Sequence, residues 1–105
     1  MNDQALLAAL KENRIVWRRH GLERMMQRGI SRAAVKAVLG ANDVLTEYTD
    51  DRPFPSALYH GEVGGEKLHV VAAVDAQRNE VHVITAYRPE PERFGANGRT
   101  RRKRR

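Results

Sequence analysis

The feature that most constrains the fold is a pair of glycines, Gly64-Gly65, between two stretches rich in β-forming residues. The flanking stretches read "ALYHGEV" and "EKLHVVAAVD", and a two-residue glycine loop between such stretches is a strong hairpin signal. Residues 43–48 and 80–88 also have the composition of strands. Residues 49–56 hold two prolines, which exclude regular structure there. The second half of the chain is therefore predicted to form a four-stranded antiparallel β-meander.

Three helices are predicted before this sheet. Leucines recur at helical spacing in residues 3–13, and a second helix spans residues 20–28 and stops at Gly29. Ser31 caps a third helix that runs to Leu39 and stops at Gly40. The letters "IVWR" between the first two helices indicate either a short strand or a packed lead-in to the second helix. The predicted fold class is α+β, with the N-terminal helices packed on one face of the sheet.

The length of 105 residues bounds the chain to one small domain. We divide it into an N-terminal helix (1–14), an α+β domain (15–94) and a disordered basic tail (95–105). The lack of cysteine excludes disulfides and thiolate metal sites. No apolar run approaches the roughly 20 residues that span a bilayer, and the N-terminus lacks the order of a signal peptide. We expect a soluble cytoplasmic protein with no membrane partner.

The charge is concentrated at two places in the chain. The tail "RTRRKRR" (99–105) accounts for the net charge of +6, and residues 14–36 hold many basic side chains against the single acid Glu23. Such a distribution favours a polyanionic partner, and nucleic acid is the first candidate. The side chains expected to bind RNA are Arg18, Arg19, Arg88, Arg101, Arg102, Lys103 and Arg104.

The segment "HGLERMMQRGIS" (20–31) holds the candidate site on the second helix. At about 100° per residue, His20, Arg24 and Arg28 lie within about 80° of one another on a helix. The opposite arc is apolar and is expected to face the core: Leu22, Met25 and Met26. The basic arc is either an ordinary solvated face or a site where two guanidiniums hold phosphate oxygens beside an imidazole.

The predicted sheet supplies further histidines. A two-residue turn at Gly64-Gly65 pairs His60 with His69, and the next turn then pairs His69 with Ala86. This register puts His60, His69 and Arg88 on a half-open face and Tyr87 on the face that packs on the helices. His69 is either a site residue or an ordinary sheet histidine. No third ligand is clearly placed beside His60 and His69, so neither a metal nor another cofactor is expected.

Several segments together resemble a known bacterial family. The stretches "HGLERMMQRGIS", "EYTDDRPFPSALYHG", "KLHVVAAVD" and "VHVITAYRPEPERF" resemble the family of domains of unknown function numbered 4258, over residues 20–93. That family is similar to the RelE, BrnT and MqsR-like toxins of type II toxin–antitoxin pairs. The resemblance implies a RelE-like architecture, endoribonuclease (mRNA interferase) activity and a cognate antitoxin partner. The positions that match its polar motif, and are implied as catalytic, are His20, Arg24, Arg28, His69 and Tyr87.

Two hypotheses of function follow. In the first, the chain is a toxin-like endoribonuclease that cleaves RNA without a metal. His20 and His69 then serve as acid and base in either order, while Arg24, Arg28 and Arg88 stabilise the phosphate. In the second, the chain is a non-catalytic module that binds RNA or an antitoxin through the basic helix and tail. A small-molecule enzyme has less support, because no pocket motif is visible.

Overall fold

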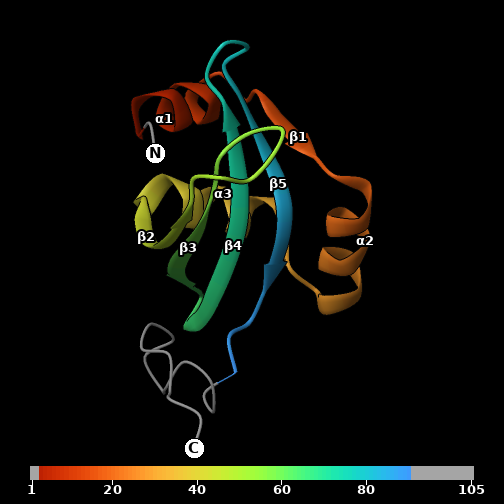
Figure 1. Cartoon of the computed structure of the whole chain (residues 1–105). Helices are drawn as coiled ribbons and strands as arrows, with labels where there is room; N and C mark the ends of the chain where they lie inside the picture. The colour runs from red at the N-terminus through yellow and green to blue at the C-terminus, as the bar shows by residue number, and fades with distance from the viewer. Residues whose placement is uncertain (1–2, 91–105) are drawn as a thin grey trace, which may run out of the picture.

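Three helices and five strands make up residues 3–90, the part of the chain that the computed structural model describes (Figure 1). The predicted tail, 95–105, lies outside these residues. The helices are α1 (Asp3–Lys11), α2 (Arg19–Arg28) and α3 (Arg32–Ala41). The strands are β1 (Ile15–Trp17), β2 (Asp43–Tyr48), β3 (Ser56–Val63), β4 (Glu66–Asp75) and β5 (Glu80–Tyr87). The α+β class with three helices is confirmed.

The sheet is mixed and has the strand order β1-β5-β4-β3-β2. The neighbours from β2 to β5 pair antiparallel, whereas β1 pairs parallel with β5. The prediction of a four-stranded antiparallel sheet was therefore wrong. The segment Ile15–Trp17 is a strand because its backbone forms hydrogen bonds with the outer edge of β5. Around this strand, the Val81 N–H donates to the Arg14 carbonyl (3.0 Å) and the Arg18 N–H to the Val83 carbonyl (3.3 Å).

The ends of the helices follow local capping rules, with one departure from the prediction. Gly29 ends α2 in a left-handed conformation (φ 67°), and Ser31 caps α3 by accepting a hydrogen bond from the Ala34 N–H (3.0 Å). The helix α3 does not stop at Gly40. It continues to Ala41 and ends at Asn42, which takes the left-handed conformation itself (φ 55°).

The core lies between the helices and one face of the sheet. Leu6 of α1 and Val35 and Leu39 of α3 are buried in one cluster with Tyr59 and Val70 of the sheet. Figure 1 shows α2 in a different place, beside β5, where α2 also makes its contacts. The helices α1 and α3 thus cover one face of the sheet, whereas α2 lies beside β5.

The position of α2 at the sheet edge changes which of its apolar residues are buried. Met25 is buried in the core, but Met26 is 74% exposed, against the expectation that both face the core. The edge contact buries a narrower stripe of α2 than packing over the sheet would. No helix within residues 3–90 is long and apolar enough to cross a membrane.

Candidate functional site

A β-bulge in β5 sets the geometry of the site. Ala72 pairs with Val83, but Val71 pairs with Thr85, so Ile84 is an extra residue on β5. Beyond the bulge, His69 lies opposite Tyr87 and not opposite Ala86 as predicted. Because one extra residue exchanges the two faces of a strand, Tyr87 joins the face that carries His69. The prediction that Tyr87 packs toward the helices was wrong.

Four polar side chains therefore cross the sheet in a line, one from each of four adjacent strands. We call Asp43, His60, His69 and Tyr87 the polar row. Asp43 of β2 pairs with His60 of β3, His60 with His69 of β4, and His69 with Tyr87 of β5. The pairing of His60 with His69 is the one predicted from Gly64-Gly65. All four side chains thus lie on the sheet face opposite α1 and α3.

The members of the polar row contact one another directly. The Nδ1 of His60 lies 3.2 Å from Oδ2 of Asp43, and Nδ1 of His69 lies 3.4 Å from the Tyr87 hydroxyl. The ring of His69 meets the ring of His60 edge-on (centroids 5.8 Å apart) and the ring of Tyr87 in the same manner (5.4 Å). The row is therefore a chain of hydrogen bonds and ring contacts, in which His69 stands between two rings.

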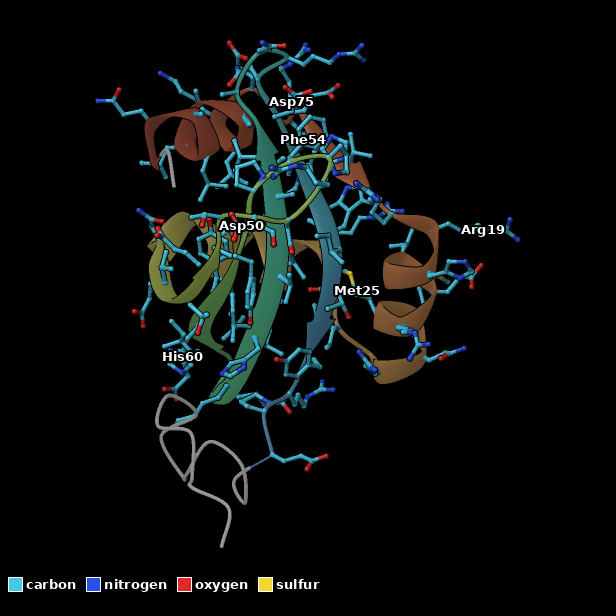
Figure 2. The ribbon with its side chains drawn as sticks, viewed as in Figure 1. Arg19, Met25, Asp50, Phe54, His60 and Asp75 are labelled. Carbon is cyan, nitrogen blue, oxygen red and sulfur yellow. The ribbon has the colours of Figure 1, made fainter. Side chains whose placement is uncertain are left out.

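Access to the polar row differs from one residue to the next. His69 is completely buried, although its face was predicted to be half open. The His60 side chain is 11% exposed, and Tyr87 is half-buried. Figure 2 shows His60 at the end of the sheet from which β5 leaves toward the C-terminus. A ligand that approaches this face therefore meets Tyr87 before His69.

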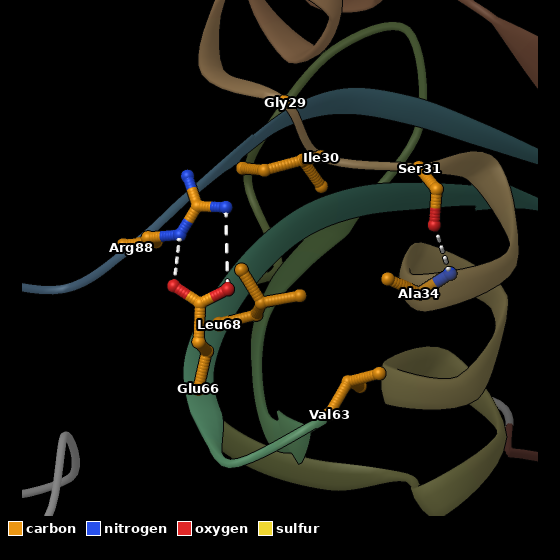
Figure 3. A pocket seen from close by; sticks show the side chains of 8 residues that line it. All are labelled: Gly29, Ile30, Ser31, Ala34, Val63, Glu66, Leu68 and Arg88. Atoms are coloured by element: carbon orange, nitrogen blue, oxygen red, sulfur yellow. Dashed lines mark hydrogen bonds and ion pairs between the residues drawn. The ribbon is translucent and has the colours of Figure 1, made fainter.

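The same bulge turns Arg88 away from the polar row. Arg88 lines a small pocket of about 170 Å³ on the helix side, together with Ser31, Leu68 and Glu66 (Figure 3). Its Nε donates to Oε2 of Glu66 (2.7 Å), and its Nη1 donates to the carbonyl of Arg28 (2.6 Å). Arg88 thus ties α2 to the end of β5. It does not lie beside His60 and His69, contrary to the prediction.

One of the three predicted site residues on α2, Arg28, contacts the backbone of β5 next to the row. The Nη1 of Arg28 donates to the carbonyl of Ala86, the residue before Tyr87 (2.8 Å). Arg24 is exposed, and the His20 side chain is 90% exposed and lies 3.8 Å from a carboxylate oxygen of Glu23. Among residues 3–90, no hydrogen bond, ion pair or ring contact joins His20 or Arg24 to the polar row.

The remaining residues predicted to bind RNA are dispersed. The Nε of Arg18 donates to Nδ1 of His82 (3.4 Å), and the ring of His82 lies against Phe54 of the loop 49–55 (5.3 Å). Arg19 is exposed and pairs with Glu23 (3.2 Å), and Figure 2 shows its side chain pointing away from the sheet. The predicted contacts of the tail, Arg101, Arg102, Lys103 and Arg104, lie outside the described residues.

Two members of the row were not recognised from the sequence as site residues. His60 was considered as a metal ligand, but no group of three or more His, Cys, Asp or Glu within residues 3–90 is placed to hold a metal ion. Asp43 was missed because its position opposite His60 depends on an irregular pairing. A bulge lies between Val44 and Thr46, and the connection to β3 has no regular structure, so no pattern in the sequence predicts this register.

Comparison with known proteins identifies a family for most of the chain. A family model described as a domain of unknown function (DUF4258) matches residues 17–88. No curated protein and no solved structure matches the chain. The matched range begins at the end of β1 and includes α2, α3 and the whole polar row.

Proposed function

Because the chain belongs to the DUF4258 family, we propose that it shares the activity suggested by the family's likeness to RelE, BrnT and MqsR-like toxins. The chain is then an endoribonuclease of a toxin–antitoxin pair with a RelE-like architecture, which cleaves RNA in the cytoplasm by acid–base catalysis without a metal. One observation carries the proposal. Tyr87 is half-buried and its hydroxyl lies 3.4 Å from Nδ1 of the buried His69, while Arg28 donates to the carbonyl of Ala86, the residue before Tyr87.

We infer that Tyr87 and not His69 contacts the substrate, because His69 is completely buried whereas Tyr87 is half-buried. Tyr87 Oη removes the proton from the 2′-hydroxyl of the RNA as its own proton passes to Nδ1 of His69. The 2′-oxygen then bonds to phosphorus, the bond from phosphorus to the 5′-oxygen breaks, and the leaving oxygen takes a proton from water. The products are a 2′,3′-cyclic phosphate and a 5′-hydroxyl. The imidazole afterwards returns its proton to solvent.

Arg28 supplies the positive charge that this step needs. A guanidinium has five N–H donors, and the bond to Ala86 uses one of them. The others are available for the oxygens of a phosphate held at Tyr87, where negative charge develops in the transition state. Arg24, one helical turn earlier on the exposed side of α2, binds the adjoining part of the RNA backbone.

His20 takes a different role from the one predicted. It precedes Arg28 by eight residues on α2, and at 1.5 Å per residue this places the two backbones about 12 Å apart. The His20 side chain is also 90% exposed and lies beside Glu23, so we do not assign it to proton transfer at a phosphate held by Arg28 and Tyr87. We assign His20 to binding of the RNA backbone along α2, together with Arg24.

The test is cleavage of a labelled RNA by the purified full chain, with induced expression as a parallel assay of growth. The wild type is expected to arrest growth and to leave 2′,3′-cyclic phosphate ends. Tyr87→Phe keeps the ring against His69 and loses only the hydroxyl, so cleavage should fall by about 10²–10⁴-fold with the fold and RNA binding retained. Tyr48→Phe, an exposed tyrosine of β2, is the matched control and should behave as wild type. Equal cleavage by Tyr87→Phe and wild type would contradict the assignment.

A second candidate is favoured by the complete burial of His69. If the chain only binds RNA or an acidic antitoxin through the exposed arginines of α2, no cleaved ends appear with any variant. RNA affinity then falls steeply with salt and declines by similar steps as Arg19 and Arg24 are replaced by alanine. Tyr87→Phe leaves such binding unchanged, and the same set of proteins therefore separates the two candidates.

A further inference from the structure

Two members of the polar row, Asp43 and His60, take no part in the proposed cleavage step. They lie on the far side of His69 from Tyr87, on β2 and β3. The two side chains nevertheless make a specific contact, and His60 is largely buried. The His60 side chain is 11% exposed, and its Nδ1 lies 3.2 Å from Oδ2 of Asp43.

The contacts of His60 show which part of its ring the fold uses. The Nε2 atom is buried and has no hydrogen-bond partner within residues 3–90, so Asp43 is the group that fixes the ring through a hydrogen bond. Buried polar atoms without a partner are uncommon and call for an explanation. The ring of His60 makes a close edge-on contact with His69 (78° between planes). The part of His60 that meets a neighbour other than Asp43 is therefore its ring, against His69.

The contact with His60 limits the space in which the His69 ring can turn. A histidine ring rotated by 180° about its last torsion angle exchanges a nitrogen for a carbon on each side, and would turn Nδ1 away from the Tyr87 hydroxyl. Rings of His60 and Tyr87 stand on either side of His69, at centroid distances of 5.8 and 5.4 Å. Moving His60 opens the space on one side and removes the constraint on the rotation.

We propose that Asp43 and His60 are positioning residues: Asp43 fixes the ring of His60, and this ring holds His69 with Nδ1 toward Tyr87. The inference rests on the proposed function for its effect on catalysis. Asp43 and His60 do not touch substrate in this scheme. Removing either therefore lowers kcat and leaves KM unchanged, since RNA binding belongs to α2 and Arg28.

The test compares four substitutions in the full chain. Asp43→Ala and His60→Ala are expected to lower kcat at least tenfold at constant KM. Asp43→Asn keeps an acceptor oxygen for Nδ1 of His60 and should restore kcat to near the wild-type value. Glu47→Ala removes a carboxylate from the same strand, at a position opposite Ala57 on the other sheet face, and serves as the control. Circular dichroism and thermal melting confirm that each variant is folded.

A second measurement does not require activity. Nitrogen-15 NMR of the imidazoles reports which nitrogen of His69 carries the proton, and nuclear Overhauser contacts report its distance from Tyr87. Asp43→Ala should change both signals, and Asp43→Asn and Glu47→Ala should change neither. If the wild type cleaves no RNA but this pattern appears, the positioning role is supported and the proposed function fails. If the wild type cleaves RNA while Asp43→Ala keeps its kcat and its His69 signals, the positioning role is overturned.

Discussion

The helix α2 approaches the backbone of β5 closely at Gly21, and replacing this glycine tests the placement of the whole helix. An added Cβ would overlap the carbonyl oxygen of Ile84 and lie 3.0 Å from its carbon. Carbon atoms in contact are about 3.5–4.0 Å apart, so α2 must retreat from β5 by about 0.5–1 Å. Since backbone lies on both sides of this contact, no side chain can rotate to relieve it.

The free-energy change of Gly21→Ala combines two opposing effects. Overpacking of this kind costs about 1–3 kcal/mol, and the rigid contact with backbone favours the upper end. Replacing glycine by alanine inside a helix returns about 1 kcal/mol. We expect a net destabilisation of about 2 kcal/mol, which for a domain of this size lowers Tm by about 8–16 °C.

Gly40→Ala is the matched control for this prediction. Gly40 is also inside a helix, α3, and an added Cβ there meets nothing within 4 Å. This variant keeps only the gain in helix propensity, so it should be more stable than wild type by about 0.5–1 kcal/mol. Urea unfolding followed by circular dichroism measures both variants. If Gly21→Ala is as stable as Gly40→Ala, α2 does not lie against Ile84 and the position of Arg28 at the site is wrong.

Two further predictions concern the helices that support the site. Leu6→Ala should destabilise the fold by about 2–5 kcal/mol, because Leu6 of α1 is fully buried in the core. Leu7→Ala, at a neighbouring residue that is 45% exposed, should change the stability little. Equal unfolding midpoints for the two variants would show that α1 does not pack as described. Ser31→Ala removes the cap of α3 and should cost about 1 kcal/mol, whereas Ser31→Asn, which retains a capping oxygen, should stay near wild type in the same measurement.

The parts of the site that follow from local patterns could be predicted from the sequence. The hairpin at Gly64-Gly65 set the pairing of His60 with His69, since a two-residue turn determines the register of the strands it joins. Gly29 and Ser31 likewise marked the end of α2 and the start of α3. These features depend on a few adjacent residues, whose chemistry is visible in the printed sequence.

The parts that depend on distant contacts could not be predicted. The alternation of apolar and polar residues in β5 is interrupted where Val83 and Ile84 are both apolar, but this local break does not by itself show which strand position is bulged. The parallel pairing of β1 with β5 joins segments about 65 residues apart in sequence. Met25 is buried and Met26 is exposed because α2 packs at the edge of the sheet beside β5, and the helical pattern of α2 alone does not show this.

The bulge at Ile84 links both sides of the site. Without the extra residue, Ala86 would lie opposite His69, and Tyr87 would point toward the helices. With it, Tyr87 completes the polar row on one face while Arg88 turns to the other, where it binds Glu66 and the carbonyl of Arg28. One irregularity thus places the Tyr87 hydroxyl beside His69 and anchors α2, whose Arg28 donates to the carbonyl of Ala86. The placement of Tyr87 and of Arg28 is therefore coupled through the backbone, and a change that removes the bulge should disrupt both together.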